Sequence, residues 1–440
     1  MSTAKSGGVT RRGFLGLAGA ALAAPALAAC NVSGNSGTSN AAGGGGTLKF
    51  WDMPWGQPAY NDAGKKLVEA YAPSGELPKA SYQVIQWNNF YQTFSSAIAS
   101  GSGPAVSSGA GFQAFQFAEQ GAIAYADNVI EALKKDGTYD DFLPNVLDSM
   151  KTSAGYVAVP WQLDMRILWY NKAILDQAGL KLPTTWDELH TTGVALRKLG
   201  ISGFAIGSGA GNPMGSHVMV AMMINNGGGL FDPDGKPDCV TDVNVEAIEF
   251  LLELVNEGII DKGSVSFTID NVSGLWNTGK AAIGFYSPGL TGAAPKTAAN
   301  LVVADPLTGP RGGKGAVNFV NNLMMYKDTP SQQGSEEFLQ YYLRNLHTYW
   351  DNKVASSIPV LKSIADSPAF SADPNNTKIV KEWQPISKNY AATGSTLFAG
   401  LAAVDGGQAL SQFTQTILRG GTDARSALTT LQKGIEAVVQ

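Results

Sequence analysis

The chain is poor in charge, cysteine and histidine. Only 15% of its 440 residues are charged, well below the ~25% of an average globular chain. Its 36 acidic residues outnumber 31 basic ones, so no basic surface is expected and nucleic acid is excluded as a partner. Two cysteines and three histidines leave little material for disulfides, metal centres or a catalytic triad.

Familiar catalytic and cofactor motifs are also missing. The glycine-rich stretches Gly207–Gly211 and Gly309–Gly315 lack the Gly-Lys-Ser/Thr ending of a phosphate loop, and no Gly-x-Ser-x-Gly elbow occurs. The histidines His190, His217 and His347 are scattered. Asp232–Asp238 has its glycine too early for a calcium loop and lacks the final Glu, which favours a simple turn. We therefore expect no catalytic residue, no cofactor and no metal.

The first residues have the pattern of an export signal. Arg11 and Arg12 precede a mildly apolar run from Gly13 to Ala29, which is too short and too weakly hydrophobic for a membrane-spanning helix. The segment 1–29 resembles a Tat signal peptide, and Leu27-Ala28-Ala29-Cys30 resembles a lipobox, in which Cys30 is acylated. The alternative is a signal peptide with a chance cysteine near its end. Residues 30–46 are uncharged and rich in Gly and Ser, as in a flexible tether.

From Thr47 onward, strand and helix patterns alternate, which indicates an α/β architecture, and the length allows two or three domains. We expect strands at 47–51, 82–87 and 203–207, and a helix near Gly334–Trp350. Thr185 and Glu188 have the spacing of a capping box at the start of a further helix. No internal repeat is apparent.

Several segments together resemble a known family. They are Gly155–Pro160, Leu168–Lys172, Ala178–Leu180, Pro183–Leu189, Gly279–Ala282 and Ile358–Val360. In this order they are similar to the extracellular solute-binding lipoproteins of ABC importers, in the carbohydrate class that includes maltodextrin-binding proteins. The resemblance covers residues 47–440. It implies a type II periplasmic-binding-protein-like fold, with two Rossmann-like lobes that close about a hinge over a ligand in the cleft between them.

The resemblance also implies an organisation and a set of partners. Lobe 1 would contain residues 47–160 and 305–360, and lobe 2 residues 165–300 and 365–440. The expected partners are a carbohydrate ligand, the permease subunits of an importer and, through Cys30, the membrane. The protein would be a monomer, lipid-anchored outside the cytoplasm on the bacterial cell membrane.

Candidate ligand-binding residues follow from the chemistry of a sugar, which offers hydroxyls at its edge and apolar C–H faces for aromatic rings. Most follow predicted strands, at the end where open α/β sheets bind ligands. They are Asp52, Trp55, Trp87, Asn88, Phe112, Gln113, Trp161, Asp164, Arg166, Tyr286, Asn318 and Asn321. Asp164 and Arg166 lie two residues apart, so on an extended segment they point to the same side. We expect Asp164 to accept from sugar hydroxyls while Arg166 orients it.

Three departures from the family pattern argue against maltodextrin as the ligand. Ala105 stands where the family often has Asp, Gly289 replaces a common Trp, and Gly109, Phe112 and Gln113 occupy the place of an aromatic and an Asp-Arg pair. A different neutral mono- or oligosaccharide is expected.

Other interpretations remain open at this point. One alternative to ligand binding is that Asp164 and Arg166 form only an interlobe ion pair. Another is that Asn88, Asn318 and Asn321 only complete turns or strand ends. Trp51, Trp169, Trp186 and Trp276 have the apolar neighbours of packing residues, and Cys239 that of a buried small residue. For the whole protein, the alternatives are a binder of a polyol or other small polar solute, or a secreted glycoside hydrolase using Asp52 and Asp164.

Overall fold

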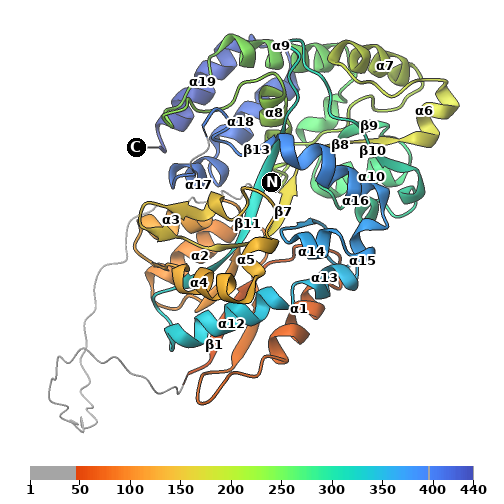
Figure 1. Ribbon diagram of the computed structural model, residues 1–440. Coiled ribbons are helices and arrows are strands. Elements are labelled where there is room, and N and C mark those ends of the chain that lie inside the picture. Colours follow the sequence, from red (N-terminus) through yellow and green to blue (C-terminus); the bar gives the residue numbers. More distant parts are fainter. Residues whose placement is uncertain (1–45, 395–396, 440) are drawn as a thin grey trace, which may run out of the picture. The chain divides into compact units, whose positions relative to one another are not determined.

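The computed structural model describes residues 46–394 and 397–439, all of which belong to one compact unit (Figure 1). The predicted signal segment, Cys30 and almost all of the predicted tether lie outside the described residues. Among the described helices, none is both long and apolar enough to cross a membrane.

The larger of the sheets has eight strands, in the order β12-β7-β11-β3-β1-β2, with β4 and β13 also paired to β11. Its strands are β1 (Leu48–Asp52), β2 (Ala80–Val84), β3 (Val106–Gly109), β4 (Ile123–Ala124), β7 (Val159–Met165), β11 (Ala316–Tyr326), β12 (Ile358–Pro359) and β13 (Ser387–Lys388). β1 runs parallel to β2 and β3, whereas β11 is antiparallel to β3 and β7. The sheet is therefore mixed: β1, β2 and β3 are parallel at one side, and the short β13 is also parallel to β11.

Helices cover both faces of this sheet because successive residues of a strand point to opposite faces. On β1, Phe50 packs against Phe338 and Tyr342 of α12 (Gln332–Arg344), with ring centroids 5.3 and 5.0 Å away. The next residue, Trp51, packs edge-on against Phe94 of α2 (Phe90–Ala99) at 5.3 Å. Trp51 is thus a core residue, as its apolar neighbours predict.

A second sheet of three strands has the order β10-β8-β9, with all pairs antiparallel. It consists of β8 (Ile167–Asn171), β9 (Ile283–Tyr286) and β10 (Leu301–Val303), and a separate hairpin joins β5 (Lys151–Thr152) to β6 (Gly155–Tyr156). Only Arg166 separates β7 from β8. The chain therefore passes from one sheet to the other in a single extended run.

The described residues contain nineteen α-helices. Those before β7 are α1 (Tyr60–Glu69), α2 (Phe90–Ala99), α3 (Gln113–Glu119), α4 (Asp127–Asp136) and α5 (Thr138–Asp141). Those between β8 and β10 are α6 (Lys172–Ala178), α7 (Trp186–Lys198), α8 (Met214–Asn225), α9 (Asp242–Asn256), α10 (Ile269–Asn277) and α11 (Leu290–Ala293). Those after β11 are α12 (Gln332–Arg344), α13 (His347–Asp351), α14 (Lys362–Ala365), α15 (Pro368–Ser371), α16 (Pro374–Lys378), α17 (Gly400–Asp405), α18 (Ala409–Arg419) and α19 (Ala424–Glu436).

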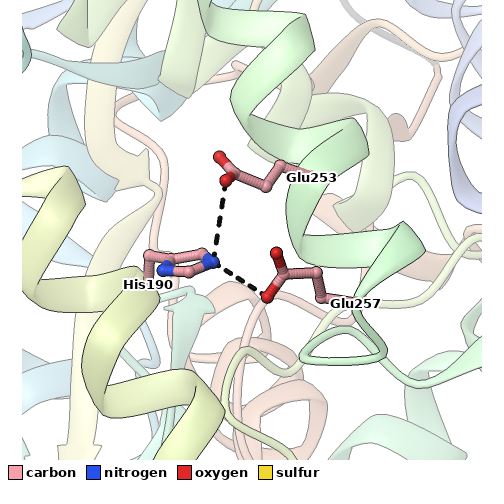
Figure 2. A group of neighbouring side chains, drawn as sticks. All are labelled: His190, Glu253 and Glu257. Atoms are coloured by element: carbon pink, nitrogen blue, oxygen red, sulfur yellow. Dashed lines mark hydrogen bonds and ion pairs between the residues drawn. The ribbon is translucent and has the colours of Figure 1, made fainter.

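Helices α7 and α9 lie against one another, and His190 of α7 meets Glu253 of α9 and Glu257, the residue that follows α9 (Figure 2). His190 of α7 places Nε2 at 3.0 Å from Oε2 of Glu257 and 3.7 Å from Oε1 of Glu253. All three side chains are at least partly exposed. The group therefore links two helices at their edge, where an ion pair contributes little stability.

Two expected elements differ from the structure. The stretch 203–207 is not a strand: a single bridge from Ser202 to Ala281 and one bond from Ala205 N to Ile283 O attach it to the region of β9. The helix expected over Gly334–Trp350 is two helices, α12 and α13. The amide of Asn345 donates to the Tyr341 carbonyl at 2.8 Å, so this side chain occupies the acceptor that a continuing helix uses.

The predicted capping box is only half formed. Thr185 accepts a hydrogen bond from Glu188 N at 3.3 Å. The Glu188 carboxylate, however, accepts from the backbone and hydroxyl of Thr184 at 2.8 and 2.7 Å, one residue before the expected partner.

The largest missed element is β11, the eleven-residue strand at the centre of the main sheet. Asn318, Asn321 and Asn322 interrupt its apolar pattern and hide it. The sequence signal that favours a long strand here is the absence of Gly and Pro from Ala316 to Lys327.

Asn225, at the end of α8, ties three segments together inside the protein. Its Oδ1 accepts from Trp186 Nε1 at 2.8 Å and its Nδ2 donates to the Leu307 carbonyl at 2.8 Å. Asn225 is buried, and every residue of α8 is buried as well, as expected for a helix enclosed on all sides.

We predict that Asn225→Leu lowers the free energy of unfolding by about 3 kcal/mol, because it leaves a buried indole N–H and a buried carbonyl without partners. Urea denaturation measures the change. Asn352→Ala is the control, since Asn352 makes a comparable bond to Thr348 on the surface, and we expect it to change stability by less than ~0.5 kcal/mol. Equal losses in the two variants would contradict this role of Asn225.

Candidate functional site

Three of the candidate tryptophans form one cluster, which we call the tryptophan cluster: Trp55, Trp87 and Trp161. The Trp55 ring stands edge-on to Trp87 at 4.6 Å and to Trp161 at 5.7 Å. Trp161 is fully buried, whereas Trp87 keeps 40% of its surface exposed. Its indole N–H donates to the Pro54 carbonyl at 3.0 Å, which fixes the ring. The cluster therefore presents one aromatic ring to a ligand and supports it with two buried ones.

Asp52, at the end of β1, lies beneath this cluster and is fully buried. Its Oδ1 accepts from Ser108 Oγ at 2.6 Å and Trp55 Nε1 at 3.1 Å, and its Oδ2 accepts from Tyr82 OH at 2.9 Å. Its Oδ1 also accepts from Met53 N at 2.8 Å. Burial raises the pKa of Asp52 to about 6, although the hydrogen bonds oppose this shift. In this structure Asp52 holds Trp55 in place, and its oxygens are already occupied by protein donors.

Asp164 and Arg166 face each other across the end of β7, as expected from their spacing. Arg166 Nη1 lies 2.8 Å from Asp164 Oδ1, without the alignment of a hydrogen bond. The guanidinium is buried, donates from Nε to His217 Nδ1 at 3.0 Å and from Nη1 to the Met165 carbonyl at 3.2 Å. Asp164 is the more exposed partner. The pair thus has a fixed cation and an anion that is open on one side.

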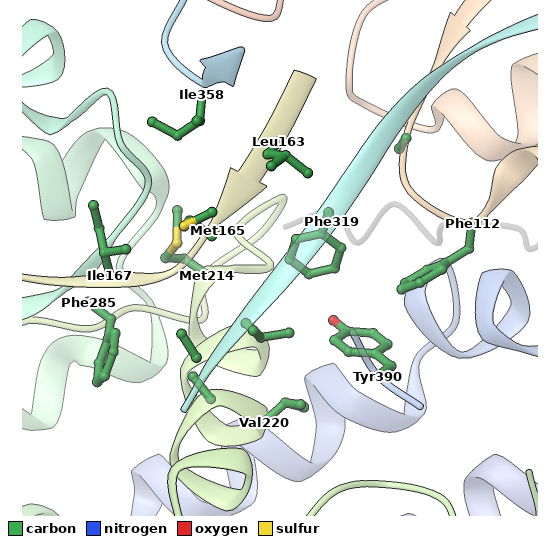
Figure 3. Packing of buried hydrophobic residues seen from close by; sticks show 14 of the residues in the cluster. Phe112, Leu163, Met165, Ile167, Met214, Val220, Phe285, Phe319, Ile358 and Tyr390 are labelled. Atoms are coloured by element: carbon green, nitrogen blue, oxygen red, sulfur yellow. The ribbon is translucent and has the colours of Figure 1, made fainter. Parts of the chain in front are cut away.

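An aromatic cluster of Phe112, Phe319 and Tyr390 lies next to this pair, and Figure 3 shows these three rings close to one another. Phe319 of β11 packs against Phe112 at 5.9 Å and against Tyr390 at 5.5 Å. The Arg166 guanidinium lies 5.3 Å from the centre of the Phe319 ring, within the range of a cation–π interaction. Phe112 is buried at this junction, so it supports Phe319 and Tyr390.

A second carboxylate lies beyond His217. His217 Nε2 is 3.9 Å from Oδ1 of Asp405 at the end of α17, and Tyr91 of α2 donates to Asp405 Oδ2 at 3.0 Å. Burial and the neighbouring Arg166 hold the pKa of His217 well below its usual range, so its ring is neutral. Burial raises the pKa of Asp405.

The other candidates are placed individually. Tyr286 is buried at the end of β9, where its hydroxyl lies 2.8 Å from Ser273 Oγ, and burial raises its pKa. Asn318 donates to Ser387 Oγ at 2.7 Å, and this contact joins β11 to β13. Asn321 is buried opposite Gln162 of β7. Asn88 is exposed in the loop before α2.

Gln113 is fully buried at the start of α3, where its Oε1 accepts from Ala110 N at 2.8 Å. Its Nε2 has no partner among the described residues, and the same is true of both amide atoms of Gln162 and of Asn322 Oδ1. Asn322 was not predicted because β11 was not recognised. Gln162 lies on β7 two residues before Asp164, and the sequence does not show that its amide is buried without a partner. His217 was set aside because the three histidines are scattered along the sequence. Tyr390 and Asp405 were not predicted because they reach this site only through the fold, from the segment after β11.

One group in the described part of the chain has the donors of a metal site, and it lies away from these residues. His190, Glu253 and Glu257 bring one nitrogen and two carboxylates within 4.8 Å of one another (Figure 2). Cation binding is not required to explain it, since the imidazole already interacts with both carboxylates.

A hollow of about 480 Å³ lies beside β10 and α16. None of the candidate residues lines it; its walls include Tyr170, Val303 and Lys378. It is therefore separate from the tryptophan cluster and the Asp164–Arg166 pair.

Comparisons with known proteins bear on the fold and the site. Residues 59–345 match the family described as bacterial extracellular solute-binding protein. A crystal structure of a sugar transporter from Arthrobacter chlorophenolicus A6 with bound laminaribiose is 57% identical, covers 90% of this chain and 100% of its own, and has a TM-score of 0.86.

More distant proteins are also similar to this chain. Maltose-bound T. maritima MalE3 is 18% identical with a TM-score of 0.74, and the match covers 89% of this chain and 99% of that one. A Brucella abortus (strain 2308) protein described as a binding protein is 23% identical over 363 residues, which is 79% of this chain and 86% of its own length. These likenesses confirm the expected type II periplasmic-binding-protein fold.

The raised pKa of Asp52 predicts a pH dependence of stability. An acid whose folded pKa is about 6 and whose unfolded pKa is about 4 binds more protons in the folded state between these values. The free energy of unfolding therefore falls as pH rises from 4 to 7, by about 3 kcal/mol from this group. Urea denaturation at four pH values measures it, and Asp52→Asn is expected to remove this part of the slope. Parallel profiles for the wild type and the variant would contradict the assignment.

Proposed function

Because this chain belongs to the family of bacterial extracellular solute-binding proteins, we propose that it is the substrate-binding component of an ABC sugar importer. Its ligand is a neutral mono- or oligosaccharide. The observation that carries this proposal is the 57% identity, over 100% of its length, of a sugar transporter that holds laminaribiose. A disaccharide of this kind has the hydroxyl edges and C–H faces that indole and amide side chains recognise.

In the proposed complex, the half-exposed Trp87 stacks on one sugar face. Its ring is held by the Pro54 carbonyl and by Trp55, and Trp55 is held by Asp52. Such a fixed ring loses little entropy on binding. Asp164 accepts from sugar hydroxyls while Arg166 keeps its carboxylate in place.

Two lobes that close over the ligand are part of the proposal, with residues 47–160 and 305–360 in lobe 1 and 165–300 and 365–440 in lobe 2. Two contacts are consistent with closure across this division. Tyr91 bonds Asp405, and a Cβ added at Gly292 would lie 1.9 Å from Gln57 Nε2. The single extended run from β7 to β8 through Arg166 suits a hinge strand.

We propose binding without catalysis. A glycoside hydrolase needs two carboxylates free to act on the bond, and Asp52 is enclosed by four donors. Asp164 alone does not supply both roles.

The proposal extends to export, anchoring and partners. The Tat-type segment 1–29 directs export, acylated Cys30 anchors the protein to the outside of the cell membrane, and residues 30–46 act as a tether. The protein works as a monomer that delivers its ligand to the permease subunits of the importer.

We predict that the protein binds laminaribiose with a micromolar or lower Kd, and that Trp87→Ala weakens binding at least tenfold because the stacking face is lost. Isothermal titration calorimetry measures both. Leu199→Ala is the matched control, since Leu199 is also a large exposed apolar residue, at the end of α7, and its affinity is expected to be unchanged. An unaltered Kd in Trp87→Ala would remove this ring from the site.

A second prediction concerns the anchor. Cys30→Ser is expected to move the protein from the membrane fraction to the soluble extracytoplasmic fraction, because the acylated residue is lost. Cys239→Ala provides the control: this cysteine is buried, and burial raises the pKa of its thiol to about 12. Immunoblots of cell fractions decide the question, and a Cys30→Ser protein that stays with the membrane argues against lipidation.

A further inference from the structure

Gln162 of β7 is the most unusual polar residue of the described chain. Its side chain is fully buried, yet neither its Oε1 nor its Nε2 has a hydrogen-bond partner among the described residues. An unpaired buried polar group is costly, and such groups in native proteins call for an explanation. A bound ligand that reaches this residue supplies one.

Two further amides near Gln162 are each half anchored. Gln113 fixes its Oε1 on Ala110 N at 2.8 Å and leaves its Nε2 unpaired. Asn322 fixes its Nδ2 on the carbonyls of Gly111 and Val320, both at 3.3 Å, and leaves its Oδ1 unpaired. In each amide, one atom is therefore held by a hydrogen bond to the backbone, and the other, Gln113 Nε2 or Asn322 Oδ1, is left free in a fixed position.

These amides lie close together in the fold. A Cβ added at Gly109 would lie 3.2 Å from both Gln113 Oε1 and Asn322 Oδ1, so the two side chains flank this glycine. On β11, Asn322 follows Asn321, which pairs with Gln162 across the ladder. The ladder shifts between Asn321 and Asn322, so Asn322 lies opposite Pro160, two residues before Gln162 on β7. Because residues two apart on a strand point to the same face of the sheet, the shift places Asn322 and Gln162 on one face.

The free atoms include both donors and acceptors. Gln113 Nε2 and Gln162 Nε2 donate, whereas Gln162 Oε1 and Asn322 Oδ1 accept. Asp164 Oδ1, two residues along β7 from Gln162, is paired with Arg166 Nη1 at 2.8 Å and does not belong to this free set. Hydroxyl groups satisfy such a mixed set because each one both donates and accepts. An anion accepts only and would face the two free acceptors.

The buried cation at this junction, Arg166, is already engaged. Arg166 is buried, lies against Asp164 and Phe319, and donates to His217. It is therefore not free to bind a phosphate or carboxylate on a ligand.

We propose that Gln162, with Gln113 and Asn322, is the hydroxyl-binding centre of the site. Together they select a neutral polyhydroxylated ligand over a charged sugar. This inference rests on the proposed function, and it adds which residues bind the hydroxyls of the ligand and select a neutral sugar over a charged one.

Gln162→Leu tests the role of the amide. We expect laminaribiose affinity, measured by isothermal titration calorimetry, to fall at least tenfold. The melting temperature of the unliganded protein is expected to stay the same or rise, because leucine removes the unpaired polar group at a similar volume. A purely structural glutamine would give the opposite pair of results, a lower melting temperature with unchanged affinity, and would overturn the inference. Gln162→Met carries the same expectations if the leucine variant does not fold.

Ser202→Ala is the matched control. Ser202 Oγ is also a buried atom without a partner, but it lies by the bridge to Ala281, near the smaller sheet. Its removal is expected to leave affinity unchanged. An equal loss of affinity in this variant would show that the effect is general, and would overturn the assignment to Gln162.

Selectivity is tested with the wild type against laminaribiose, glucuronic acid and glucose 6-phosphate. The neutral disaccharide is expected to bind, and each charged sugar at least tenfold more weakly. Tighter binding of a charged sugar would overturn the neutral class. A wild type that binds none of these or of a wider sugar panel would overturn the proposed function itself. A wild type that binds laminaribiose, with unchanged affinity in Gln162→Leu, would overturn only the role of Gln162.

Discussion

The buried guanidinium of Arg166 constrains the centre of this structure. A charge that cannot reach water must be paired and hydrogen-bonded where it lies, and Arg166 is the single residue between the strands of the two sheets. Its partners come from three different elements: Asp164 from β7, His217 from α8 and the Phe319 ring from β11. The position of each of these elements is therefore tied to the point where the chain passes between sheets.

A second buried ion has the corresponding role on the side of the parallel strands. Asp52 ends β1 and gathers donors from Trp55, Tyr82 and Ser108, so it joins the loop after β1 to β2 and β3. Burial raises its pKa, which shows that the charge is maintained at a cost. The two ions act in the same way: each is unavailable to a ligand itself and each fixes a side chain that is more exposed, Trp87 by way of Trp55 in one case and Asp164 in the other.

The sequence revealed the alternation of strands and helices, the family resemblance and most of the polar candidates, because these depend on local patterns. The Asp164–Arg166 pair followed from the two-residue spacing alone. The sequence did not reveal β11, because three asparagines break the apolar pattern of this strand. Nor did it reveal the contact between Tyr91 and Asp405, since these residues are 314 positions apart. Asp52 is predicted to bind the ligand because it follows a strand. Only the fold shows that Tyr82 and Ser108, from distant segments, enclose it together with the nearby Trp55.

Unpaired amides in a closed interior also bear on how closure depends on ligand. A ligand shifts a conformational equilibrium only through interactions that differ between the two states. If Gln162, Gln113 and Asn322 are dry and unpaired when the proposed lobes meet without sugar, the closed state carries the cost of three incompletely bonded amides. Sugar hydroxyls that complete these hydrogen bonds remove the cost in the closed state alone. In an open state water forms hydrogen bonds with the amides, so the sugar brings no comparable gain there. The same side chains that select a neutral sugar would then make closure of the lobes depend on the presence of that sugar. Apolar side chains in place of the three amides would give a more stable protein but would lack this coupling between binding and closure.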